Sequence, residues 1–253
     1  DYYLHAEHLY EFAKLVIDRV KHQESRLKQW LAPLWTQTLS DGFALIRNEI
    51  WFQHGDSNFA ADATRIMKLF VHRQQLGRRV SADVRHQLAV SLDLIDDDFR
   101  RSPEVATCFL SILRYPKAVA ATLRRMHRWQ VLDRYLPEFG VIRSLVRLDR
   151  YHQYTVDEHT LYAIENLEAA TLARLEDGQV FLNIREGVEK PELLRLAILL
   201  HDVGKGTQGP SGHEDRSVEM AKIVLNRLGL NAGDQEVVLF LISRHLDMSY
   251  TAQ

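Results

Sequence analysis

The sequence contains a single cysteine, Cys108, among its 253 residues. A lone cysteine excludes an internal disulfide and a cysteine-rich zinc site, and it favours a reducing compartment, so we expect a cytoplasmic protein. Long apolar runs are also missing. The longest candidate, residues 196–200, is far shorter than the roughly 18 to 20 residues that a membrane-spanning helix needs, so we expect no membrane segment.

An excess of charge of one sign is missing too. The chain has 32 Lys and Arg residues against 34 Asp and Glu residues, which gives a formal net charge of −2. Bulk electrostatics therefore gives no sign of a DNA partner. The length allows one large domain or two modest ones. Because the chain begins with Asp1-Tyr2-Tyr3 rather than with methionine or a signal peptide, we expect a fragment of a longer protein.

Apolar residues recur at helical spacing along most of the chain, which predicts an all-α protein. An early apolar stripe runs from Leu9 to Val20. The pattern predicts later helices at about 60–75, 81–94, 103–114 and 116–128. The exception is the segment 42–52, where two short apolar runs flank the polar residues 47–49; this pattern predicts a small β-hairpin.

The sequence also has twelve histidines, and their surroundings separate them into groups. Six stand among charged neighbours on expected helical surfaces, and we interpret them as structural or exposed residues: His5, His8, His22, His72, His86 and His127.

A different pattern surrounds His201 and Asp202. A helix that begins at Pro191 is apolar on nearly all sides, so it must be buried, and it runs directly into this pair. Two adjacent ionisable groups at the end of a buried helix are costly unless they are compensated. A divalent cation would compensate them, because imidazole supplies a neutral nitrogen and a carboxylate can bridge two ions. A hydrogen bond between the pair and a neighbouring helix is the simpler alternative.

Three more histidines occupy positions from which they could converge on this pair. His159 lies at the start of an amphipathic helix, His213 lies just inside a helix that runs to Leu228, and His245 ends an apolar helix. Each histidine alone is compatible with a structural role. Together with the buried pair, they favour a metal site suited to metal-assisted hydrolysis.

These residues resemble the ligand series of the HD superfamily of metal-dependent phosphohydrolases. The series is His159, then His201-Asp202-Val203-Gly204-Lys205, then His213 and His245. Three longer segments, 131–140, 152–160 and 245–249, resemble the central part of the bifunctional uridylyltransferase/uridylyl-removing enzymes, which modify the PII nitrogen-signalling protein. The first residues and the hairpin region resemble the segment that follows the nucleotidyltransferase domain of those enzymes. The resemblance thus extends over essentially the whole chain.

The resemblance implies a domain organisation and a partner. Residues 1–148 would form a helical linker domain with the hairpin, and residues 149–253 a C-terminally truncated HD metal-dependent phosphohydrolase domain, an HD-superfamily helical bundle. The nucleotidyltransferase domain and the pair of ACT domains of the full-length enzymes would lie outside this chain. The expected activity is hydrolysis of the phosphodiester that joins UMP to a tyrosine of PII, so uridylylated PII is the expected partner.

The resemblance also implies roles for individual residues. One or two divalent ions, Mn²⁺ or Mg²⁺ or another transition metal, would be held by His159, His201, Asp202, His213 and His245. Asp202 would bridge or anchor the metals, and Lys205 would bind the substrate phosphate, which makes these two the expected catalytic residues. A surface lysine at a helix C-terminus is the alternative for Lys205. HD enzymes complete the metal shell with a further aspartate. We expect that residue beyond Gln253, since Asp247 stands in a slot where the family usually has an apolar residue.

Two other functions stay open at this point. The same site could act on a free nucleotide or a cyclic dinucleotide. Alternatively, the chain could be a non-catalytic helical module that binds PII or transmits a signal between flanking domains.

Overall fold

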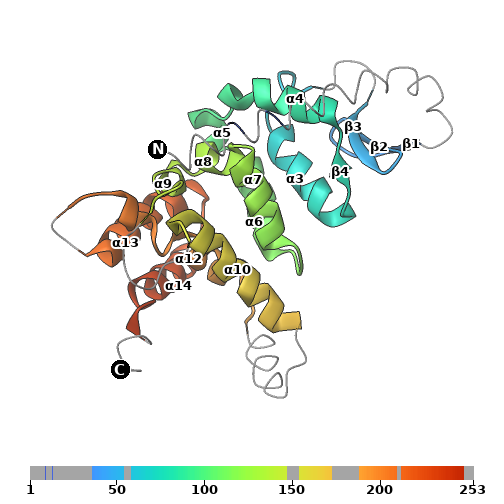
Figure 1. The fold of residues 1–253 in the computed structure, drawn as a ribbon. Coiled ribbons are helices and arrows are strands. Elements are labelled where there is room, and N and C mark those ends of the chain that lie inside the picture. The colour runs from blue at the N-terminus through green and yellow to red at the C-terminus, as the bar shows by residue number, and fades with distance from the viewer. Residues whose placement is uncertain are drawn as a thin grey trace. The chain divides into compact units, whose positions relative to one another are not determined.

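A computed structural model of the chain describes residues 36–53, 58–146, 154–172, 188–209 and 212–247, together with Leu9 and Ala13. The predicted helix over Leu9–Val20 lies outside the described residues, except for these two positions, which are helical. The chain divides into two compact units, residues 1–99 and 100–253. The described residues are mainly helical with one small sheet, so the predicted fold class is confirmed (Figure 1).

The first unit contains the sheet. Strands β1 (Thr36–Thr38), β2 (Phe43–Ile46) and β3 (Glu49–Phe52) pair antiparallel, and β4 (Arg79–Val80) pairs parallel to β3. β2 and β3 form the predicted hairpin. Its turn is Arg47-Asn48, and both residues have a positive φ, 49° and 73°, as a tight two-residue hairpin loop requires.

Helices cover this sheet within the first unit. They are α3 (Arg65–Leu76), α4 (Ala82–Val90) and the 3₁₀ helix η2 (Leu92–Leu94), followed by α5 (Asp97–Arg101) at the boundary of the units. Phe43 of β2 and Phe70 of α3 are fully buried and belong to the core. The sequence pattern predicts one helix over 81–94, whereas the structure divides this segment into α4 and η2.

The second unit is entirely helical in its described part. Its elements are α6 (Pro103–Arg114), α7 (Val119–Arg128), α8 (Val131–Tyr135), α9 (Pro137–Gly140), α10 (Val156–Leu172), α12 (Pro191–Leu200), the 3₁₀ helix η3 (Val203–Gly206), α13 (His213–Arg227) and α14 (Ala232–Ser243). α6 begins at Pro103 as predicted, because Ser102 Oγ accepts a hydrogen bond from the backbone N–H of Val105 at 3.4 Å.

α12 is the central helix of this unit, as its apolar sequence predicts. It packs against α6, α10 and α14, and Leu196, Leu199 and Leu200 are fully buried. Its buried charges have partners on the segment that ends α6: Arg114 Nη2 donates to Glu192 Oε1 at 2.7 Å, and the Arg195 guanidinium donates to the carbonyl of Tyr115 at 2.9 Å. A charge that is paired in this way avoids most of the desolvation cost of burial.

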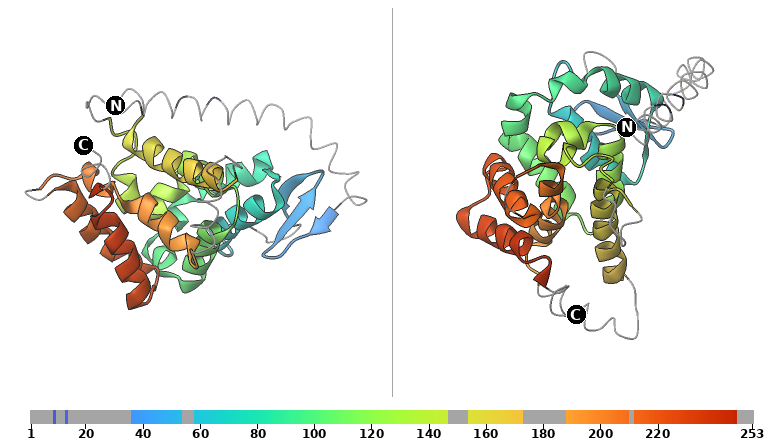
Figure 2. Two further views of the ribbon diagram at one scale, coloured as in Figure 1. Left: turned by 90° about the horizontal axis from the view of Figure 1, so that it is seen from below. Right: turned by 60° about the vertical axis from the view of Figure 1, so that its left-hand side comes forward.

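The last two helices close the unit. α13 packs against η3 and α14, and α13 and α14 lie side by side (Figures 1 and 2). None of the described helices is both long and apolar enough to cross a membrane.

Candidate metal centre

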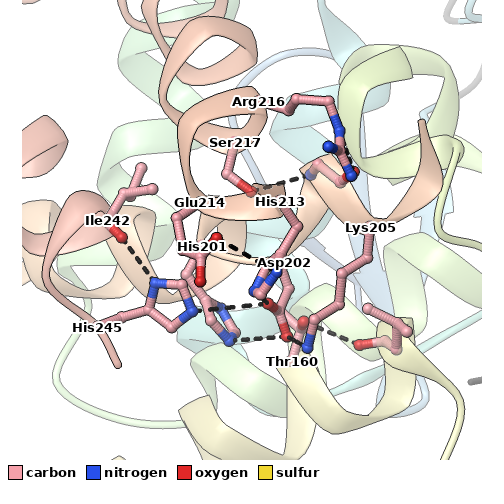
Figure 3. A network of polar contacts seen from close by, with 12 residues as sticks. Thr160, His201, Asp202, Lys205, His213, Glu214, Arg216, Ser217, Ile242 and His245 are labelled. Carbon is pink, nitrogen blue, oxygen red and sulfur yellow. Dashed lines mark hydrogen bonds and ion pairs between the residues drawn. The ribbon is translucent and has the colours of Figure 1, made fainter. Parts of the chain in front are cut away.

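The five predicted ligands come from four separate segments and meet at one point. His159 lies in the first turn of α10, His201 and Asp202 follow α12, His213 is the first residue of α13, and His245 lies just past the end of α14. Each is therefore at or near a helix terminus. Figure 3 shows His201, His213 and His245 around the Asp202 carboxylate.

These side chains form two overlapping groups that could hold metal ions. One group is His159, His201 and Asp202, and the other is Asp202, His213 and His245; within each group the ligand atoms lie within 4.8 Å of one another. Asp202 is common to both groups. Because a carboxylate has two oxygens, it can bridge two cations, and the arrangement therefore has room for one ion or two.

Three atoms at the centre of the second group are buried and lack a hydrogen-bond partner among the described residues. They are Asp202 Oδ1, His213 Nε2 and His245 Nε2. The two ring nitrogens lie 3.5 Å and 3.8 Å from that oxygen, which is too long for a good hydrogen bond. A buried polar atom without a partner costs free energy, and three of them facing one another are what a cation would satisfy.

The tautomers of two histidines also fit a metal. His201 Nδ1 lies 2.7 Å from the carbonyl oxygen of Ile198, and His245 Nδ1 lies 2.7 Å from that of Ile242. A carbonyl only accepts, so each Nδ1 carries the proton. In the neutral ring of His245 the Nε2 lone pair is then left to face Asp202, as is usual for metal-ligating histidines. His201 Nε2 lies 3.1 Å from Asp202 Oδ2.

The electrostatics keep the ligands in their metal-binding forms. Burial lowers the pKa of both His213 and His245, so the two rings stay neutral near pH 7. Burial works against ionisation of Asp202, but the hydrogen bonds and charges of His201 and Lys205 outweigh it and hold the pKa of that carboxyl well below its usual range. The site therefore combines neutral imidazoles with an ionised carboxylate.

Lys205 lies in η3, directly beside this carboxylate. Its Nζ donates a hydrogen bond to Asp202 Oδ2 at 2.8 Å, and its side chain is only 18% exposed. The lysine is thus held at the candidate centre rather than on an open surface. Asp247 lies elsewhere: its carboxylate is 3.4 Å from Arg244 and 53% exposed, and it belongs to neither ligand group.

The turn between the His-Asp pair and Lys205 packs tightly against α13. A Cβ atom added to Gly204 would lie 2.2 Å from the carbonyl oxygen of His213 and 2.7 Å from the backbone nitrogen of Ser217. The Gly204 N–H also donates to Ser217 Oγ at 2.9 Å, and Ser217 is fully buried. Only glycine allows this approach, which places His213 next to Asp202. The role of Ser217 could not be predicted from the sequence, since a single serine inside a helix carries no signal of its own.

A second polar cluster supports the start of α10. His127 is a structural residue, as one of the two sequence interpretations held, but its predicted place on a helical surface is wrong: it is buried, with 2% exposure. Its two ring nitrogens lie 2.6 Å from Asp133 and 2.9 Å from Asp157, and Arg143 pairs with Asp133. Asp157 also accepts a hydrogen bond from the backbone N–H of Ser144 at 2.8 Å. Because Asp157 lies two residues before His159, this cluster fixes the helical turn that carries a candidate ligand.

The comparison with known proteins defines the class first. Residues 156–252, which include all five candidate ligands, match the family model of the HD domain. Residues 43–135 match the model described as the third domain of the uridylyltransferase GlnD.

Curated relatives identify the particular proteins that the chain resembles. It is 40% identical over 163 residues to the bifunctional uridylyltransferase/uridylyl-removing enzyme of Methylococcus capsulatus. This match covers 64% of this chain and 18% of the relative. It is 31% identical over 245 residues to the enzyme of the same name from Ruegeria pomeroyi, and this match covers 94% of this chain and 25% of the relative. The enzyme of the same name from Azospirillum brasilense is 34% identical to this chain over 223 residues. The predicted resemblance is confirmed, and the chain spans between 18% and 25% of the length of these relatives.

Proposed function

We propose that residues 149–253 act as a metal-dependent hydrolase domain that removes UMP from uridylylated PII, and that residues 1–148 act as its helical linker domain. The observation that carries the proposal is the cluster of three buried, unpartnered ligand atoms around Asp202. The names of the curated relatives supply the uridylyl group as the substrate. The cytoplasmic location stays a prediction.

In this proposal the two ligand groups have the same chemical character. His159, His201 and Asp202 would hold one divalent cation, and Asp202, His213 and His245 would hold a second. A set rich in imidazole favours a transition metal over Mg²⁺, which prefers oxygen ligands, and the shared carboxylate is a ligand that also suits Mn²⁺. When bound, such ions supply Lewis acidity and positive charge toward a phosphodiester anion.

Lys205 has a distinct part in the proposed reaction. Water attacks the phosphorus, the bond between phosphorus and the tyrosine oxygen breaks, and the phenolic oxygen leaves with a proton, which gives free tyrosine and UMP. Negative charge gathers on the nonbridging oxygens as the water approaches. The Lys205 ammonium, held 2.8 Å from Asp202, places a positive charge at the position where such an oxygen would bind.

The test is release of UMP from uridylylated PII in the presence of Mn²⁺. We expect Asp202→Asn to reduce the rate by at least about a hundredfold, because it removes the negative ligand that both groups share. Asp247→Asn is a matched control, since this aspartate lies outside both groups, and we expect it to leave the rate unchanged. Equal rates for Asp202→Asn and the unaltered chain would overturn the proposal. Hydrolysis of free nucleotides in preference to uridylylated PII would favour the free-nucleotide alternative, and PII binding without metal or hydrolysis would favour the binding module.

A further inference from the structure

Two tyrosines stack on each other at the surface of the second unit. The ring centroids of Tyr154 and Tyr162 are 5.4 Å apart, and the ring planes are inclined by 27°. Both residues are exposed, at 51% and 43%. Aromatic rings usually gain their free energy by burial, so an ordered pair that is open to solvent marks a surface on which a further ring can stack.

Tyr162 lies on the same helix as a candidate metal ligand and close to it in sequence. Tyr162 follows His159 by three residues on α10, and residues at this spacing lie on neighbouring positions of one helix face, with about 5–6 Å between their Cβ atoms. Side chains on a helix lean toward its N-terminus, so Tyr162 leans toward the turn that carries His159. The opposite side of α10 is the core side, where Leu161 and Ile164 are fully buried. Tyr162 therefore lies on the solvent-exposed side of the helical turn that carries His159, and Tyr154 stacks on it there.

We propose that Tyr154 and Tyr162 form a stacking surface for the base of the nucleotide whose phosphate lies at the candidate metal centre. The inference rests on the proposed function and adds a subsite to it. In a nucleotide the ribose separates the base from the phosphate, and this separation matches one helical turn between His159 and Tyr162. Base–aromatic stacking is the usual way in which proteins hold an unpaired base.

Stacking has a consequence for specificity. Every base has a π-face, so a surface that only stacks holds uracil and adenine about equally well. The subsite therefore favours a nucleotide over the corresponding sugar phosphate, without selecting one base over another.

The experiment measures the dissociation constants of UMP, AMP and ribose 5-phosphate for the Mn²⁺-treated chain by calorimetry. We expect both nucleotides to bind about tenfold or more tightly than ribose 5-phosphate. Tyr162→Leu should remove most of this difference, whereas Tyr162→Phe should keep it, because phenylalanine retains the ring. Phe240→Leu serves as the control, since Phe240 is an exposed ring, at 61%, on α14, and we expect it to change nothing.

Several outcomes would overturn this inference. They are equal binding of UMP and ribose 5-phosphate, no measurable binding of UMP, or an unchanged ratio in Tyr162→Leu. Loss of affinity for unmodified PII in Tyr162→Leu, with the nucleotide ratio intact, would instead make the pair a protein contact. Binding requires no turnover, so the two proposals fail separately: a chain that stacks nucleotides through Tyr162 but never releases UMP from PII would contradict the proposed function alone.

Discussion

His127 and Asp157 face each other in the interior of the second unit, with 2.9 Å between the imidazole Nε2 and a carboxylate oxygen and almost no exposure of either side chain. The other ring nitrogen lies 2.6 Å from Asp133. Burial alone would lower the pKa of His127, but the hydrogen bonds to the two carboxylates outweigh burial and raise this pKa to about 9. The ring is therefore a buried imidazolium that joins α7 to the start of α10.

This pair predicts a specific dependence of stability on pH. The pKa of His127 is higher in the folded chain than the ordinary value of 6.5, so its contribution is fully present below pH 6.5 and is lost as the pH rises toward 9. A shift of this size corresponds to about 3 kcal/mol. We expect the free energy of unfolding in urea, measured with a chelator present, to fall over this range. In His127→Gln the fall should be smaller by about that amount, and parallel pH profiles for the two proteins would contradict the account.

The neutral state of two ligands gives a second prediction. Because burial lowers the pKa of His213 and of His245, protons compete with a metal at these rings only below the usual histidine range. The affinity for Mn²⁺, measured by calorimetry, should therefore stay nearly constant from pH 8 to pH 6.5 and should fall at lower pH. An affinity that already declines steadily between pH 8 and pH 6.5 would contradict the lowered pKa values of these two rings.

Gly204 allows a test of the tight contact between η3 and α13. We expect Gly204→Ala to lower the free energy of unfolding by about 1–3 kcal/mol and to weaken metal binding, because the added methyl group meets backbone atoms of His213 and Ser217. The matched change is Gly233→Ala in α14, where the added Cβ would lie 3.5 Å from Asn231 Oδ1. There we expect unchanged metal binding and equal or greater stability in urea. If both variants behaved alike, the close approach at Gly204 would have no functional importance.

Much of the fold could be predicted from the sequence because its signals are local. The start of α6 follows from Ser102 and Pro103, and the burial of α12 follows from its apolar composition. Strands β1 and β4 could not be predicted, because they carry no such local signal. β1 is a short exposed run of polar residues, and β4 has only two residues and exists through its pairing with β3, so neither has an alternating apolar pattern.

The candidate site could be predicted only in part. Spacing alone showed that His159, His213 and His245 could converge on the His-Asp pair, and the resemblance to the HD superfamily selected them. The role of His127 could not be predicted, because its neighbours Arg125 and Arg128 resemble those of a surface helix, while its partner Asp157 lies 30 residues away. Contacts between distant segments decide which polar residue is buried, and such contacts leave no local pattern in the sequence.

The most direct test of the central claim is the stoichiometry of Mn²⁺ binding to the purified chain. Two ligand groups that share Asp202 predict up to two ions, with partial loss in His159→Ala and in His213→Ala, because each of these changes damages one group. They predict loss of both ions in Asp202→Asn and no change in Asp247→Asn. Binding of Mn²⁺ that persists undiminished in Asp202→Asn would contradict the assignment of this carboxylate as the common ligand.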